Sequence, residues 1–384
     1  MTAWIPIRHR IIARDPHGVA GLVLALSPED RTEVARHLPA LRDELNEADP
    51  DAWGDEDNEG GDGIGGHGAA LRVAGAGALP GPAAVAAWLT RREFVAHWSE
   101  EMAPVIRVLT ARPAAWQADL ATRLTRKIGR ADDRNAAPLA LALLRACGAP
   151  PPEHDPLVAA WLRTRPSLDD PLFAPLLPRI FEAEGAGRAL RSDRVAGPLL
   201  ALLPQASANG RVSRAALLDG CLGRFLRGGA EIDLRFFIRL HQALAPTPEE
   251  AAERRRAYVG LLPGGPPAVA ALALNQLAQA GPLEPDQAVE ATAALIFRPE
   301  ARLALEGLRR LERGLPHGVD LAPALAAAFG HASYEVQGRA ARIALRHAEV
   351  FASTAAVILE GAALLPAALA VRVHSTYGKP YSDQ

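Results

Sequence analysis

The sequence contains very little lysine, cysteine or aromatic side chain. Only two of its 42 basic residues are lysines, Lys127 and Lys379, so nearly all of the positive charge is arginine. There are also only two cysteines, Cys147 and Cys221, both in apolar, helix-like settings. This number excludes a disulfide framework and a cysteine-based zinc site. We expect two small core thiols in a reducing, cytoplasmic compartment.

Long uninterrupted hydrophobic runs are also missing. The run Val19–Leu26 is short and ends at Ser27, a typical helix-capping residue, so it does not resemble a signal peptide. Residues 355–371 are apolar but are interrupted by Glu360 and Pro366. A closing helix therefore explains them better than a membrane span, and we expect no membrane association.

The common catalytic motifs are absent. The chain has no nucleophile elbow, phosphate-binding loop, dinucleotide fingerprint or zinc-binding histidine pair at helical spacing. Paired carboxylates occur at Asp132–Asp133, Asp169–Asp170 and Glu249–Glu250, but each pair falls at an expected helix start, where it complements the helix dipole. We therefore predict a non-enzymatic protein with no catalytic residues, no metal and no cofactor.

The residues that are abundant favour helix. Hydrophobic residues make up 49% of the chain and aromatic residues only 5%. Alanine and leucine dominate the hydrophobic set, and no long stretch alternates with period two, so an all-α fold is predicted. From about residue 131 onward, proline and glycine separate segments of about 12 to 18 residues, or three to four helical turns.

One apolar pattern recurs in the second half of the chain. Positions at offsets 0, 4, 5 and 8 are apolar or small in segments that begin at Val269, Leu303 and Val336, at intervals of 34 and 33 residues. Three copies at a near-constant interval indicate stacked helical hairpins. We therefore predict a HEAT-like α-solenoid of antiparallel helix pairs.

The chain divides into four expected regions. Residues 1–45 form an N-terminal helical cap, and residues 69–373 form the solenoid. Residues 46–68 are rich in acidic residues and glycine, which predicts a disordered loop. A calcium-binding loop that began at Asp55 would need a bidentate glutamate at its twelfth position, where the chain has Gly66. Residues 374–384 form a polar tail whose composition changes abruptly after Val373.

Several phrases of the sequence resemble a known family. They lie at 69–76 (AALRVAGA), 86–93 (AAWLTRRE), 214–222 (RAALLDGCL), 233–240 (DLRFFIRL) and 246–250 (PTPEE). These phrases resemble an uncharacterised, mainly actinobacterial family of bacterial proteins known as domain of unknown function 6493. The resemblance extends over about residues 15–372. The resemblance implies HEAT-like helical repeats. It implies no activity.

Charge is distributed unevenly, although the formal net charge is only −2. Residues 1–70 hold 6 arginines against 14 acidic residues, a net of −8, whereas residues 211–346 hold 17 arginines against 14, a net of +3. The near-neutral net charge of the whole chain argues against a strongly basic nucleic-acid binder.

Eight arginines of the basic region are the candidate partner-binding residues. Arg302, Arg309 and Arg313 stand at offsets 0, 7 and 11, and Arg339, Arg342 and Arg346 stand at offsets 0, 3 and 7, so each set shares one helical face. Arg235 and Arg239 could extend this arginine stripe. On a concave surface they would bind an acidic peptide or a phosphate backbone. The alternative is a solvated outer face relieved by Glu306, Glu312 and Glu335. The eight are Arg235, Arg239, Arg302, Arg309, Arg313, Arg339, Arg342 and Arg346.

The tail supplies a second set of candidates: His374, Tyr377, Lys379 and Tyr381. They could form a peptide that docks a partner or is modified by an enzyme. The alternatives are a frayed terminus or a strand that packs back on the repeats.

These observations favour a scaffold that binds a peptide or protein partner on its concave face. The alternative is a structured precursor or substrate whose tail, at Tyr377 and Tyr381, is modified or docked by a partner enzyme. Nucleic-acid binding is the weaker third hypothesis.

Overall fold

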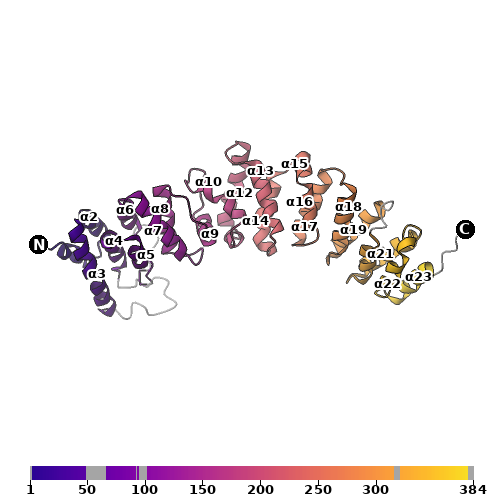
Figure 1. Cartoon of the computed structure of the whole chain (residues 1–384), viewed down its shortest axis with the longest axis horizontal. Coiled ribbons are helices and arrows are strands. Elements are labelled where there is room, and N and C mark those ends of the chain that lie inside the picture. Colours follow the sequence, from indigo (N-terminus) through magenta and orange to yellow (C-terminus); the bar gives the residue numbers. More distant parts are fainter. Residues whose placement is uncertain (1, 49–65, 92, 95–101, 315–320, 379–384) are drawn as a thin grey trace. The chain divides into compact units, whose positions relative to one another are not determined.

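The computed structural model describes residues 2–48, 66–91, 93–94, 102–314 and 321–378 (Figure 1). Within these ranges the chain is all-α, and none of the described residues forms a strand. It divides into two compact units, residues 1–199 and 200–384, which are described separately below.

The N-terminal part of unit 1 is built around α4 (Gly68–Ala78), which is buried almost throughout. Small side chains let its neighbours approach closely: a Cβ atom added at Gly75 would lie 2.2 Å from the Trp88 ring. The Trp88 indole N–H donates to the carbonyl oxygen of Leu71 at 2.9 Å, which satisfies the polar atom of a buried ring. The other helices of unit 1 are α1 (Trp4–Ile12), α2 (Pro16–Leu24), α3 (Pro28–Ala48), α5 (Pro82–Leu89), α6 (Met102–Thr110), α7 (Ala114–Lys127), α8 (Ala136–Cys147), α9 (Asp155–Arg163), α10 (Phe173–Leu176), η2 (Pro178–Phe181) and α11 (Ala186–Ala189).

Unit 2 follows α12 (Asp193–Ala208), which crosses the boundary between the units. Its helices are α13 (Arg214–Leu226), α14 (Glu231–Leu244), α15 (Pro248–Glu253), α16 (Arg255–Gly260), α17 (Pro267–Gln279), α18 (Pro285–Ile296), α19 (Ala301–Arg313), α20 (Ala322–Ala327), η4 (Ala328–Gly330), α21 (Tyr334–Arg346), η5 (Ala352–Thr354), α22 (Ala355–Ala362) and α23 (Ala367–Tyr377). Successive helices pack in pairs: α13 with α14, α16 with α17, α18 with α19, η4 with α21 and α22 with α23. Helices two or three apart also pack, as α14 with α17, α19 with α21 and α21 with α23.

The recurring sequence pattern corresponds to three helices of equal length. Helices α17, α19 and α21 each have 13 residues and begin at 267, 301 and 334. All the pattern positions are buried except Leu274, which is partly exposed. The pattern therefore identifies the packed face of these helices, and Leu274 marks where that face reaches the surface.

The turns that precede these helices contact one another. The Arg298 guanidinium, 3% exposed, donates to the carbonyl oxygen of Gly265 at 3.0 Å. His331 Nε2 lies 3.2 Å from the carbonyl oxygen of Arg298, and His331 Nδ1 accepts from the Ser333 N–H at 2.9 Å. Because one ring nitrogen faces an acceptor and the other a donor, the geometry selects the neutral Nε2–H form.

The C-terminal boundary differs from the predicted one. Helix α23 continues past Val373 to Tyr377, so the first residues of the expected tail, from His374 onward, are helical. The Tyr377 ring is 8% exposed, and its hydroxyl donates to the carbonyl oxygen of Ala344 at 2.7 Å. Val373 and Tyr377 are spaced i, i+4, so both face the core despite the polar residues between them. Lys379 and Tyr381 lie outside the described residues.

Other expected features fall partly outside the described ranges. Helix α3 extends to Ala48 and α4 begins at Gly68, so most of the predicted acidic loop, residues 49–65, is not among the described residues. Cys221 is buried, Cys147 is partly exposed, and both thiols are free. In the described part of the chain, no helix combines the length and apolar character that a membrane span requires.

Candidate functional site

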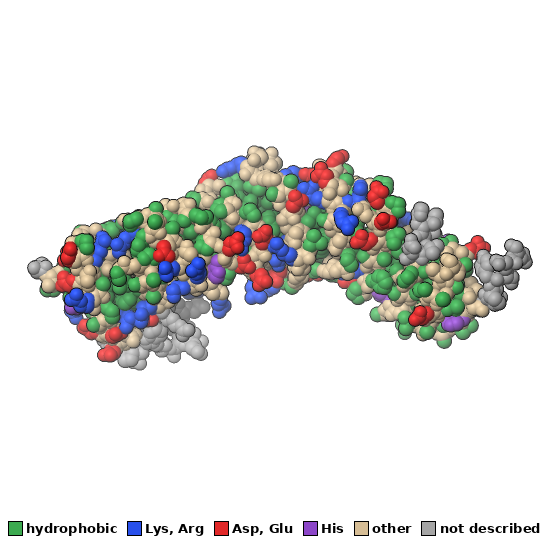
Figure 2. All heavy atoms as spheres, viewed as in Figure 1, with side chains coloured by type: hydrophobic (Ala, Val, Ile, Leu, Met, Phe, Trp, Pro, Cys, Tyr) green, Lys and Arg blue, Asp and Glu red, His purple; other side chains and the backbone are tan. Residues whose placement is uncertain are grey.

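The predicted arginines lie on α14, α19 and α21 of unit 2, and most of them are exposed. Figure 2 shows acidic and basic side chains interspersed over the visible surface of each unit, without one continuous basic patch. Whether an arginine is available to a ligand therefore depends on its ion pairs within the chain.

Two arginines of α21 are occupied by one glutamate of α19. Arg339 and Arg346 both bond Glu312, one to each carboxylate oxygen, and the Arg346 contact measures 3.0 Å. These pairs bridge the two packed helices. This is the pairing with Glu312 that the alternative, a solvated outer face, predicts, and neither arginine is an unpaired charge.

On α19 a second glutamate holds two arginines. Glu306 pairs with Arg309 at 2.9 Å and with Arg310 at 3.2 Å, over one helical turn. Arg310 is not among the eight arginines predicted from the sequence. The signal for it was the i, i+4 spacing from Glu306, a typical helical ion pair.

A groove of about 380 Å³ lies between α17 and α19 and contains Arg302. We call it the α17–α19 groove. The wall on α17 is uncharged and consists mostly of small side chains, and the wall on α19 is charged. Its lining comprises Pro267, Ala271, Leu274, Asn275, Ala278, Glu300, Arg302, Leu303, Glu306, Arg309 and Arg310.

Both acids of this groove already have partners. Glu300 accepts from Arg298 through both oxygens, each at 2.8 Å, and Glu306 holds Arg309 and Arg310. Burial alone would raise the pKa of Glu300, but the Arg298 bonds outweigh it and the pKa is lowered. Arg302 forms no ion pair with any residue that the structure describes, so it is the charge available to a ligand.

The remaining predicted arginines are not brought into this groove. Arg235, Arg313 and Arg342 are exposed and form no ion pair within the described part of the chain. Arg239 is exposed but has a partner. The structure therefore gathers Arg302 and Arg309 in one groove and Arg339 and Arg346 on one glutamate, and it does not unite all eight.

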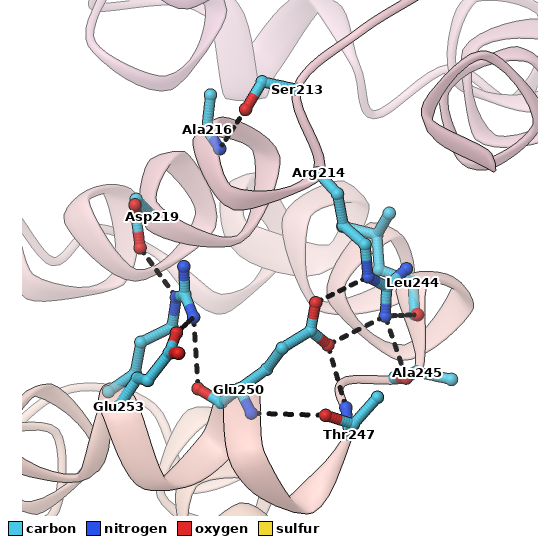
Figure 3. Close-up of polar contacts among 10 residues, drawn as sticks. Ser213, Arg214, Ala216, Asp219, Leu244, Ala245, Thr247, Glu250 and Glu253 are labelled. Carbon is cyan, nitrogen blue, oxygen red and sulfur yellow. Dashed lines mark hydrogen bonds and ion pairs between the residues drawn. The ribbon is translucent and has the colours of Figure 1, made fainter. Parts of the chain in front are cut away.

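The paired acids at helix starts have structural roles. Figure 3 shows Arg214 of α13 bonding Glu250 of α15 at 2.7 and 3.0 Å and the carbonyl oxygen of Leu244 at 2.7 Å. Glu250 also completes a capping box with Thr247. The Arg214 bond is the main reason that the pKa of Glu250 is lowered. In unit 1, Asp133 accepts the N–H groups of Asn135 and Ala136 at the start of α8.

One buried polar cluster has residue types found in active sites. His241 Nε2 lies 2.8 Å from the Tyr258 hydroxyl, and both residues, like Cys221, are 0% exposed. Burial lowers the pKa of His241 to about 4 and raises that of Tyr258 to about 12. Burial also raises the pKa of the Cys221 thiol. All three groups are held neutral and away from solvent, which suits a core and not a nucleophile.

The described residues define an all-α protein whose candidate site is an arginine-containing surface groove. Among them, no group of three or more histidine, cysteine, aspartate or glutamate side chains could hold a metal ion. No family model, curated protein or solved structure matches the chain.

Proposed function

We propose that the chain is a non-enzymatic, HEAT-like helical-repeat scaffold that binds a peptide or protein partner through the α17–α19 groove. The observation that carries the proposal is Arg302, which has no ion-pair partner among the described residues and lies in a groove whose two glutamates are both occupied. Guanidinium groups bind carboxylates with directional, charge-assisted hydrogen bonds.

The packing of unit 2 supports the repeat architecture. Helices α17, α19 and α21 are equal in length and regularly spaced, and each packs on a partner helix. Stacked repeats of this kind present extended binding surfaces more readily than deep catalytic pockets. This is also the fold implied by the resemblance to domain of unknown function 6493. The two free thiols are consistent with a cytoplasmic, reducing location.

Site-specific photo-crosslinking in the native host tests the proposal. A photoreactive residue at Ala278, on the groove wall, should capture a discrete polypeptide, and Arg302→Glu should abolish that product. Two controls lie in unit 2 away from the groove: the photoreactive residue at the exposed Glu290, and Arg256→Glu at another exposed arginine. Equal capture at Glu290, or capture unaffected by Arg302→Glu, would refute binding in this groove.

The alternative, a precursor modified on its tail, is weakened at Tyr377. Its hydroxyl is buried against Ala344 and would have to leave the core to react. A chain ending at Gly378 keeps this contact, whereas a chain ending at Val373 removes it. Fragment-ion mass spectrometry of native material would support the alternative only if it placed a modification beyond Gly378.

A further inference from the structure

Unit 1 contains a second surface groove, formed by the loop between α7 and α8 together with α8, α9 and α11. It consists of two adjoining depressions of about 430 and 560 Å³. Ala131, Asp132 and Arg163 line both depressions, so they form one elongated feature, here called the α9 groove. Its floor on α9 is made of Pro156, Ala159 and Ala160.

Three arginines from three different elements line the α9 groove, whose lining also contains Arg130 and the acidic residues Asp132, Asp133 and Glu184. Arg134 comes from the loop before α8, Arg163 from the end of α9 and Arg188 from α11. None of the three forms an ion pair with a residue that the structure describes. Arg163 lines both depressions and therefore lies between the other two.

Most of the nearby acids are already committed. Asp132 pairs with Arg130 at 3.3 Å, and Asp133 caps α8 through two N–H groups. Asp155, at the start of α9, accepts from Arg179 at 3.0 Å and from the backbone N–H of Glu184 at 2.9 Å. This second bond fixes the chain just before α11 and so positions Arg188. The groove keeps a surplus of positive charge.

The shape and composition of the groove indicate the class of ligand. Guanidinium groups spaced along a shallow groove suit separate carboxylates on an extended chain. The floor of alanine and proline leaves room for small or apolar side chains between them. The groove lining contains no aromatic ring on which the bases of a nucleic acid could stack.

We propose that the α9 groove binds an acidic polypeptide segment, with Arg163 as the central anchor and Arg134 and Arg188 on either side. This site lies entirely within unit 1 and is independent of the α17–α19 groove. It would give the scaffold a second point of attachment for a carboxylate-rich partner.

Fluorescence anisotropy with labelled deca-glutamate tests this site on the full chain. The chain carries Arg302→Glu throughout, so that the groove of unit 2 does not compete for the probe. Arg163→Ala and Arg188→Ala should each weaken binding about tenfold, the effect of losing one charge-assisted hydrogen bond. The matched control is Arg36→Ala, an exposed arginine of α3 outside the groove, which should change the affinity less than about twofold.

Three outcomes would overturn the proposal. The first is no measurable binding of deca-glutamate by the Arg302→Glu chain. The second is an equal loss with Arg36→Ala and Arg163→Ala, which would indicate general charge attraction. The third is binding of labelled deca-thymidylate as tight as that of deca-glutamate with the same dependence on Arg163, which would indicate a nucleic-acid site. Circular dichroism of each variant verifies that the helices remain folded.

Discussion

The guanidinium of Arg298 donates to the carbonyl oxygen of Gly265, 33 residues earlier in the chain, at 3.0 Å. The carbonyl oxygen of Arg298 in turn faces Nε2 of His331, again 33 residues away. Side chains thus connect three successive turns of unit 2. Hydrogen bonds therefore join positions that lie 33 residues apart, which is also about the interval between the helices that follow these turns.

Arg298→Met should destabilise the protein by about 1–3 kcal/mol, because it leaves Glu300 and the Gly265 carbonyl oxygen without their partner. Urea unfolding measures the loss. Arg302→Met, which removes an exposed arginine four positions later, should change the free energy of unfolding by less than about 0.5 kcal/mol. Equal effects of the two variants would show that the turn contacts do not stabilise unit 2.

Two mid-helix glycines should respond to alanine in opposite directions. A Cβ at Gly307 would lie 2.8 Å from the backbone nitrogen of Ile296, so Gly307→Ala should force α19 away from α18 and destabilise the protein by about 1–3 kcal/mol. Apart from the surrounding turns of α21 itself, no described atom lies within 4 Å of a Cβ at Gly338. Gly338→Ala should therefore stabilise by about 0.5–1 kcal/mol, through helix propensity alone. A thermal melt compares the two, and destabilisation by Gly338→Ala would contradict the packing described.

Alkaline pH should destabilise the folded chain through its buried tyrosines. Burial raises the pKa of Tyr377 from 10.0 to about 12, so the unfolded chain loses the proton first. The stability that neutral Tyr377 contributes is complete below about pH 10 and is lost as the pH rises towards about 12. Urea midpoints at about pH 9 and about pH 11 measure the decrease, and Tyr377→Phe should reduce it. At neutral pH the same variant should cost about 1 kcal/mol, the value of one hydrogen bond. An unchanged alkaline decrease in Tyr377→Phe would count against a buried hydroxyl.

Mild acid should act through His241. Burial lowers its pKa from 6.5 to about 4, and the charge of Arg254 adds to this effect. The unfolded chain binds the proton first, so stability is complete above about pH 6.5 and decreases as the pH falls to about 4. In spectra of ¹³C-histidine-labelled protein, the His241 ring signal, assigned with His241→Gln, should not shift between about pH 7 and about pH 5. A midpoint near 6.5 would show that the ring is solvated.

The all-α fold follows from the sequence because alanine and leucine occur at helical spacing and prolines mark the helix starts. The pattern beginning at Val269, Leu303 and Val336 identified three real helices and their packed faces. The C-terminal boundary was missed because composition was given more weight than the i, i+4 spacing of Val373 and Tyr377. Spacing reports which face packs, whereas composition reports only average polarity.

Less of the candidate site could be predicted. Helical spacing showed which arginines share a face, but their availability depends on contacts between helices. Arg339 and Arg302 look equivalent in the sequence, yet Glu312 of the neighbouring helix occupies the first and no described carboxylate occupies the second. The α9 groove joins a loop and three helices, and no local sequence pattern brings these together.

The hydrogen bonds between turns also bear on how such a chain can change in length. A deletion of residues 298–330 would bring His331 into the place of Arg298, where its Nε2–H could donate to the carbonyl oxygen of Gly265. A gain or loss of 33 residues, or a multiple of it, between Gly265 and His331 would keep a donor and an acceptor in register at the turns that these bonds join. An insertion or deletion of any other length would move the donor and the acceptor out of register. The protein therefore has a natural unit for duplication and loss, and genuine relatives of different length should differ in steps of about this size.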